Sequence, residues 1–434
     1  MTFRAIAERD GSLRVGVAKV DITPVELTAL NPIGGTSFTG VHDPIHARVL
    51  VLRDGTSEVV LVSAELIECG DMRALRERIE REFGVPATHV MITATHTHNA
   101  PRLGSVSPGA LAHDGGPESA AYTARVYDQI VGAVRAARAS VQPARFGVGT
   151  GHAAINVNRE AYVDGRWVLG YHLAGPTDPR VWVLRFDSPA GVPLAVVCNY
   201  AVHSTVALWT GEVSSDLAGA AVSHVERALG HDAVAMFTPG ALGDQNPRVS
   251  MEGSCPAGFG PHGRVPTETE RAFAYEAVAA QGLVLGAEVV RVARGIDDPT
   301  SAVRLHAAEQ VVRSPVRKGH DVMAGMVQED VDTVDLRLSL ILLNDVALAG
   351  VSGEVTATLY RRLLDRSPLA RTILVSIAND RIGYLPDDAA FDRPVHSVNG
   401  CPIVRGHAEP AIVQGITRMI REAPGLPGGS PQTA

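Results

Sequence analysis

The sequence predicts an α/β fold of layered mixed β-sheets with flanking helices, and three observations lead to this prediction. Short apolar segments bounded by glycine, proline or aspartate recur along the chain, as buried strands do. Longer segments with helical spacing of apolar residues, such as residues 71–83, lie between them. Finally, 45% of the 434 residues are hydrophobic and 20% are charged, which is ordinary for a globular protein able to build a large core.

The strands are predicted from apolar runs that end at turn residues. Asp54-Gly55, Asn344-Asp345 and the segment from Gly191 to Pro193 each separate two neighbouring runs, as in β-hairpins. We expect extended segments over residues 13–22, 46–53, 58–64, 90–92, 146–158, 181–186, 194–200, 234–237, 303–312, 336–343, 346–351 and 372–377.

The helices are predicted from apolar spacing of three and four residues together with end signals. Gly84 ends the first helix. Ser214-Ser215-Asp216 is a good N-cap for a later one, which gives Asp216 a ready structural role. We expect helices over residues 71–83, 119–140, 214–229 and 267–294, and from Glu354 to about Leu364.

Composition and charge exclude several classes of protein. The formal net charge of -8 provides no basic surface for nucleic acid or anionic lipid. Four widely spaced cysteines argue against a disulfide framework. The N-terminus has no apolar core of a secretion signal, and no apolar run is long enough to cross a bilayer. We therefore expect a soluble, cytoplasmic protein without membrane insertion, whose partner is a small-molecule substrate.

One large domain is predicted over residues 13–422, after a short N-terminal extension over residues 1–12. A sub-boundary near residues 295–300 is an option, because this segment combines glycine, two aspartates and a proline. Residues 423–434 are rich in Gly, Pro and Ser and are expected to be disordered. We find no internal repeats.

The first candidate site is the run Thr95-His96-Thr97-His98, which follows the apolar strand over residues 90–92. Side chains at i and i+2 of an extended segment project to the same side, so both imidazoles are expected to reach one small volume. Chemistry in α/β folds is commonly placed at strand ends, and neutral imidazoles suit zinc. His-x-His pairs also occur by chance, so the remaining ligands must come from elsewhere in the chain.

Further candidates stand where other predicted strands end. His203 follows residues 194–200, and Tyr384 lies in the turn after residues 372–377. Glu354 lies at a strand-to-helix junction, where it is either a metal ligand or a cap of its own helix.

Three more residues have two interpretations each. Gly34 lies in a loop that either approaches a ligand closely or forms a tight turn. Arg159 is either a substrate clamp or a surface ion-pair partner. Asp244 is interpreted as a residue that structures its loop, not as a metal ligand.

The ordered set of motifs resembles the neutral/alkaline (non-lysosomal) ceramidase family of zinc amidohydrolases, over nearly all of residues 13–420. The motifs that carry the resemblance are Gly16–Pro24, Thr95–Pro101, Asn156–Arg159, Asn199–His203, Ser214–Asp216, Leu242–Asp244, Gly353–Glu354 and Asn379–Tyr384.

The resemblance implies a role for each matched residue. His96, His203, Glu354 and Tyr384 fall on the family's zinc ligands. His98 and Arg159 fall on its substrate-contacting and transition-state residues. Gly34 falls in the loop that approaches the scissile group, and the positions of Gly240 and His396 face the substrate.

The chain also departs from the family's pattern. Gly240 replaces a serine of the family, and His396 aligns with its second site tyrosine. The chain ends near residue 434 without the family's additional C-terminal β-sandwich domain. We therefore expect a zinc-dependent amide hydrolase for a smaller and more polar substrate than ceramide. A zinc esterase or lactonase and a metal-binding, non-catalytic relative are the alternatives, and a homo-oligomer is left open.

Overall fold

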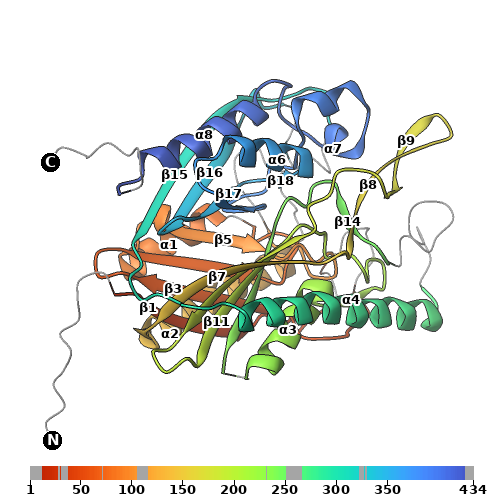
Figure 1. Cartoon of the computed structure of the whole chain (residues 1–434). Coiled ribbons are helices and arrows are strands. Elements are labelled where there is room, and N and C mark those ends of the chain that lie inside the picture. The colour runs from red at the N-terminus through yellow and green to blue at the C-terminus, as the bar shows by residue number, and fades with distance from the viewer. Residues whose placement is uncertain are drawn as a thin grey trace, which may run out of the picture.

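The computed structural model describes residues 12–27, 30, 38–70, 72–104, 116–230, 232–250, 266–321, 327 and 330–425. Its strands form several mixed sheets with helices on their outer faces (Figure 1), so the predicted layered α/β fold is confirmed. In Figure 1, α6 and α8 lie above the sheets and α3 and α4 lie below them.

The three larger sheets share one topology, which repeats along the described chain. In each sheet three strands pair antiparallel in sequence order, and a fourth strand, reached through a helix, pairs parallel with the third. A further helix follows. Unit one consists of β1 (Arg14–Asp21), β3 (His46–Arg53), β4 (Glu58–Ala64), α1 (Met72–Phe83), β5 (Val90–Ala94) and α2 (Gly116–Ala139). Unit two consists of β7 (Arg145–His152), β10 (Arg180–Asp187), β11 (Pro193–Tyr200), α3 (Asp216–Leu229), β13 (Val234–Pro239) and α4 (Glu268–Arg294). Unit three consists of β15 (Leu305–Pro315), β16 (Thr333–Leu343), β17 (Val346–Val351), α6 (Ala357–Arg366), β19 (Arg371–Val375) and α8 (Ala408–Glu422).

This threefold repeat is one of strand order and helix position, which the search of the sequence for internal repeats did not reveal. Each unit is defined by the order in which its strands pair. Many different sequences form the same strand order, so the repeat leaves no repeated sequence motif. Helix α8 was not among the helices predicted from the sequence. The extended segment expected over residues 146–158 is in fact two strands, β7 and β8 (Asn156–Val163), with a break between them.

One central core joins the three units. Leu61 of β4, Leu184 of β10 and Leu348 of β17 belong to a single buried cluster enclosed by the inner faces of the sheets. Alternate residues of the same strands, such as Val60 and Val62, pack instead against the helices on the outer face. Strands buried on both faces explain why these segments read as continuous apolar runs. The predicted domain bounds stay a prediction.

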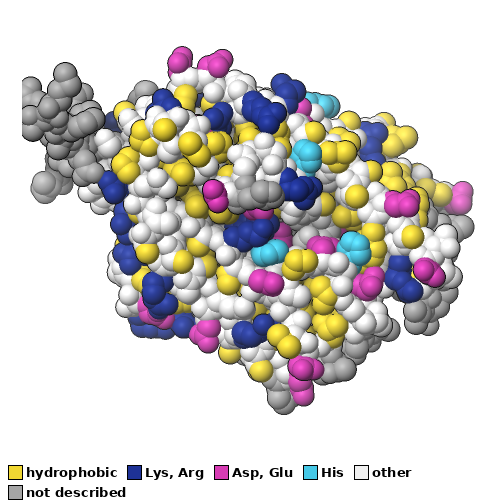
Figure 2. Space-filling model, turned by 90° about the horizontal axis from the view of Figure 1, so that it is seen from below, with side chains coloured by type: hydrophobic (Ala, Val, Ile, Leu, Met, Phe, Trp, Pro, Cys, Tyr) yellow, Lys and Arg dark blue, Asp and Glu magenta, His cyan; other side chains and the backbone are white. Residues whose placement is uncertain are grey.

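Shorter elements complete the described chain and shape the loops around the strand ends. They are β2 (Gly40–Val41), η1 (Ala87–His89), β6 (Gln142–Pro143), β8, β9 (Arg166–His172), β12 (Glu212–Val213), β14 (Gln245–Pro247), β18 (Glu354–Val355), β20 (Tyr384–Leu385), η3 (Asp388–Asp392) and α7 (His396–Asn399). Figure 2 shows acidic and basic side chains intermixed over one face of the molecule, with histidines near its middle.

Helix α4 is long and apolar enough to cross a membrane by length and composition, which the sequence analysis did not expect. Half of its most apolar window is buried in the structure, where the helix packs against α3, β7 and β10. The core helix of a soluble protein passes the same test, so this is weak evidence for a span.

Candidate metal centre

The candidate site lies where the three parallel strand pairs end, and each unit contributes to it. His96 follows β5 of unit one, His203 follows β11 of unit two, and Glu354 follows β17 of unit three. A single bridge between residues 97 and 204 joins the loops that carry His96 and His203, and another between residues 93 and 378 joins β5 to the segment after β19. Carboxyl ends of parallel strands are the usual position of sites in such sheets.

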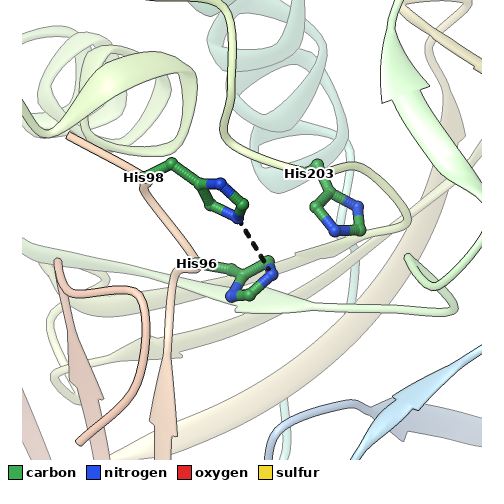
Figure 3. Close-up of side chains that lie close together, drawn as sticks. All are labelled: His96, His98 and His203. Atoms are coloured by element: carbon green, nitrogen blue, oxygen red, sulfur yellow. Dashed lines mark hydrogen bonds between the residues drawn. The ribbon is translucent and has the colours of Figure 1, made fainter. Parts of the chain in front are cut away.

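Three imidazoles meet at this point (Figure 3). Nitrogen atoms of His96, His98 and His203 all lie within 4.8 Å of one another, and the two Nε2 atoms of His96 and His98 are 3.2 Å apart. Together these side chains form a group that can hold a metal ion.

The reason expected for this convergence is wrong, although the convergence itself is present. Strand β5 ends at Ala94, and His96 has a backbone φ of 64°, so the pair does not project from an extended segment. The left-handed turn at His96 brings its ring toward that of His98. Residues other than glycine adopt this conformation at a cost of order 1 kcal/mol or more, and such strain is concentrated at functional sites.

Hydrogen bonds to backbone carbonyls set the tautomers of His96 and His203. The Nδ1 atom of His96 donates to the carbonyl of Ile67 at 2.8 Å, and that of His203 donates to the carbonyl of Gln245 at 3.0 Å. Carbonyl oxygens only accept, so each Nδ1 carries the proton and each Nε2 presents a lone pair. Metal-binding histidines are commonly oriented in this way.

The carboxylate of Glu354 completes the arrangement. It is fully buried, with Oε2 3.1 Å from Nε2 of His203 and Oε1 3.5 Å from Nε2 of His96. Helix α6 begins only at Ala357 with Thr356 as its N-cap, so the geometry favours the ligand interpretation of Glu354 over the helix-cap interpretation.

These donor atoms fit a metal ion. In a tetrahedral zinc site with bonds of about 2.0–2.1 Å, neighbouring ligand atoms lie about 3.3 Å apart. The separation of 3.1 Å between Oε2 of Glu354 and Nε2 of His203 and that of 3.2 Å between the Nε2 atoms of His96 and His98 match this spacing. Since His98 also lies at ligand spacing, geometry alone does not separate its role from that of His96.

The protonation states also suit metal binding. Burial and the nearby Arg159 and His96 lower the pKa of His203 to about 3, although the Glu354 carboxylate raises that pKa. Burial acts to raise the pKa of Glu354, but Arg381, His96 and His203 outweigh it and hold that pKa well below its ordinary value. At neutral pH the imidazole of His203 is therefore neutral and the carboxylate is ionised.

Tyr384 and Arg159 lie beside these groups. Strand β20 pairs parallel with β18, with Tyr384 in register with Glu354. Arg159 is buried and donates to the Tyr384 hydroxyl at 3.0 Å, to the carbonyl of Gly243 at 2.9 Å and to Asn246 at 3.1 Å. This excludes the surface ion-pair interpretation of Arg159. Burial, with Glu354 nearby, raises the pKa of Tyr384 to about 12, so its hydroxyl stays protonated and can donate.

The three remaining residues of the predicted site are His396, Gly240 and Gly34. The ring of His396, at the start of α7, meets the Tyr384 ring edge-on with centroids 4.9 Å apart. Gly240 lies just after β13, where an added Cβ would be 3.2 Å from Oδ1 of Asn199. Gly34 lies outside the described residues.

The pH dependence of stability should reveal the burial of His396. Burial and the nearby Arg159 lower its pKa to about 4, so between pH 6.5 and 4 the unfolded chain binds the extra proton and folding stability falls as pH falls. We expect the wild type to lose about 1 kcal/mol at pH 5.5 relative to pH 8 through this residue. His396→Phe should not show that loss. Denaturant unfolding of both proteins at the two pH values measures it, and parallel pH profiles would contradict the assignment.

Two aspartates organise the loops behind the site. The N-cap of α3 is Ser215, which belongs to the predicted Ser214-Ser215-Asp216 segment. The Asp216 carboxylate accepts from the N–H of Leu217 in the first turn and also from those of Val206 and Ala207, just after His203. Its φ of 53° turns it back toward that loop, which local sequence does not reveal. Asp244 accepts from Asn158 and from the N–H of Ala357, so its predicted loop-structuring role is confirmed.

Three charged residues near the candidate centre were not predicted from the sequence, and one of them contacts Glu354 directly. Arg381 donates to the Glu354 carboxylate, Glu68 accepts from Arg381, and Arg102 lies next to Glu68. Arg381 lies inside the Asn379–Tyr384 motif, so its position in the sequence could have marked it as a candidate site residue. Glu68 and Arg102 belong to no recognised motif.

Comparisons with known proteins identify the family and the fold of the chain. A family model described as neutral/alkaline non-lysosomal ceramidase, N-terminal, matches residues 13–266. The solved neutral ceramidase from Pseudomonas aeruginosa has a TM-score of 0.74 at 18% identity, covering 95% of this chain and 74% of that chain. A structure described as ceramidase complexed with C2 has a TM-score of 0.74 at 17% identity, covering 96% of this chain and 76% of that chain. At these identities the likeness shows the fold alone. A search of curated protein sequences found no match.

Proposed function

We propose that this chain, which belongs to the neutral/alkaline non-lysosomal ceramidase family, is a zinc-dependent hydrolase that cleaves an amide bond in a small or moderately sized acyl substrate. The family membership confirms the resemblance predicted from the ordered motifs. One observation carries the proposal: three loops from three units bring His96, His203 and Glu354 together, with imidazole lone pairs and an ionised carboxylate directed at one point.

Zinc is the metal we propose because the donor set combines neutral imidazoles with one carboxylate. His96, His203 and Glu354 would hold it, with Tyr384 as a weaker fourth ligand. When bound, zinc supplies Lewis-acid polarisation and a water molecule that ionises near pH 7.

The protein's own residues would bind and orient the scissile group. His98 is partly exposed, whereas His96 and His203 are fully buried, so we assign His98 to the substrate side of the centre. Arg159 carries a permanent positive charge and holds the Tyr384 hydroxyl at 3.0 Å. Donors fixed before the reaction stabilise the negative charge that develops on the carbonyl oxygen.

A polar substrate is supported by the charges near the centre. Arg102, Glu68 and Arg381 form a line of ion pairs that leads away from Glu354. His396 lies beside Tyr384, where the family has a second tyrosine. Because an apolar acyl chain placed beside these groups would desolvate polar and charged side chains, we propose an amide that is smaller and more polar than ceramide.

A matched panel of substrates tests the proposal. Metal analysis of the purified protein should find zinc, and a panel of amides and esters with the same acyl groups should show amide cleavage that a chelator abolishes. Cleavage of esters or lactones alone would favour the esterase reading instead. Retained zinc with no turnover of any acyl substrate would favour a non-catalytic relative, and absence of zinc would overturn the proposal.

A further inference from the structure

Four charged side chains of alternating sign run outward from the candidate metal centre, from fully buried Glu354 to partly exposed Arg102. The guanidinium of Arg381 donates to Oε1 of Glu354 through Nε at 2.9 Å and lies 2.7 Å from the same oxygen through Nη2. Its Nη1 donates to Oε2 of Glu68 at 3.1 Å. Nε of Arg102 lies 3.7 Å from Oε1 of Glu68.

The line joins two units that are far apart in the sequence. Glu68 and Arg102 follow β4 and β5 of unit one, whereas Glu354 and Arg381 follow β17 and β19 of unit three. The exposed fractions of the Glu354, Glu68 and Arg381 side chains are 0, 6 and 7%. Charges this deeply buried are tolerated only when each has an opposite partner, and the alternation provides one.

The two oxygens of Glu354 have different surroundings as a result. Oε1 receives two donors from one planar guanidinium, an interaction with strict geometry. Oε2 lies 3.1 Å from Nε2 of His203, whereas the nearest imidazole nitrogen to Oε1 that the structure gives, Nε2 of His96, is farther away at 3.5 Å. A carboxylate held in this way presents one oxygen to a metal and resists rotation.

We propose that Arg381 is a positioning residue, which holds Oε1 of Glu354 so that Oε2 alone is presented to the metal, with Glu68 holding Arg381 in turn. This inference rests on the metal centre of the proposed function. It concerns metal binding directly, so it can fail while the proposed hydrolysis stands.

A purely structural ion pair is the alternative, and the chain contains a matched control for it. Arg76 is equally buried, pairs with Glu309, and donates to the carbonyls of Ala87 and Val90 near the start of β5. The candidate centre lies beyond the other end of that strand. Arg76→Met therefore removes a buried guanidinium without touching Glu354.

Zinc affinity and the absorption spectrum of bound cobalt(II) test the proposal. Wild type, Arg381→Met, Arg381→Lys and Arg76→Met are titrated with zinc against a chromophoric chelator, and with cobalt(II). For Arg381→Met we expect zinc affinity weakened by about 10- to 100-fold, as is usual when the partner of a ligand is removed. Its cobalt(II) bands should weaken, because a freed carboxylate binds through both oxygens and raises the coordination number.

Each outcome decides between the two readings. Partial recovery in Arg381→Lys, with wild-type zinc affinity in a less stable Arg76→Met, supports the positioning role. Wild-type affinity and cobalt(II) spectrum in Arg381→Met overturn it. Should Arg381→Met not fold, Arg381→Lys and Glu68→Gln carry the test, and unchanged affinity in both overturns the proposal. A wild type that binds neither metal refutes the proposed function itself.

Discussion

Replacing His96 by alanine is expected to abolish zinc binding and to lower turnover by at least about 10³-fold, because the metal supplies several kcal/mol of stabilisation. His96 is fully buried, and its Nδ1 is held by the carbonyl of Ile67, which fixes its Nε2 toward the candidate centre. His98→Ala should keep zinc and lose rate, by about 10²–10³-fold, as for a residue that assists the reacting group. Zinc content per chain and steady-state kinetics on the best amide of the panel measure both effects.

His42→Ala is the matched control for this pair. His42 is an exposed histidine that stacks on Tyr275, so its loss should change neither zinc content nor rate. Equal loss of zinc in His96→Ala and His98→Ala would contradict the division of roles. It would make His98 a third imidazole ligand, which the 3.2 Å separation of the two Nε2 atoms permits.

Arg159→Met is expected to lower kcat/KM by about 10²–10³-fold while zinc stays bound, the usual cost of removing one donor to a developing oxyanion. The guanidinium bridges the Tyr384 hydroxyl, the Gly243 carbonyl and Asn246, so a linear side chain cannot replace it. Arg159→Lys keeps the charge but not the planar fork, and should recover only part of the rate.

Arg185→Met provides the comparison for Arg159. Arg185 lies in β10 and donates to Asp187 and to the Ala293 carbonyl, away from the candidate centre. It should lower thermal stability without a change in kcat. A rate in Arg159→Met equal to that of the wild type would show that the reaction does not use this guanidinium.

Much of the candidate site was predictable because its residues stand in ordered motifs at the ends of apolar strands. His96, His203, Glu354 and Tyr384 were each expected at such a position, and the structure brings His96, His203 and Glu354 together directly. Burial excluded the surface ion-pair interpretation of Arg159, and the position of Thr356 as the N-cap of α6 argues against the cap interpretation of Glu354. Their chemical roles stay predictions.

Other features could not be predicted from local patterns. Asp216 was expected to have a structural role at the start of α3, but its carboxylate also binds the backbone of the loop after His203, with a backbone φ of 53°. The imidazoles of His96 and His98 converge through a left-handed turn and not through strand alternation. In both loops the direction of the side chain depends on a positive backbone φ, and the residue types alone do not specify that angle.

The sequence by itself determined the layered α/β class, the order of most strands and helices, the family, and the residues that compete for the metal. These properties depend on local periodicity and on short motifs. Only the tertiary structure decided that three units of one topology enclose a common core, and that Glu354, Arg381, Glu68 and Arg102 form one line of charges. Arg381 and Glu68 stand 313 residues apart, and they meet only because burial of the three inner sheet faces in one core brings the loops of units one and three together.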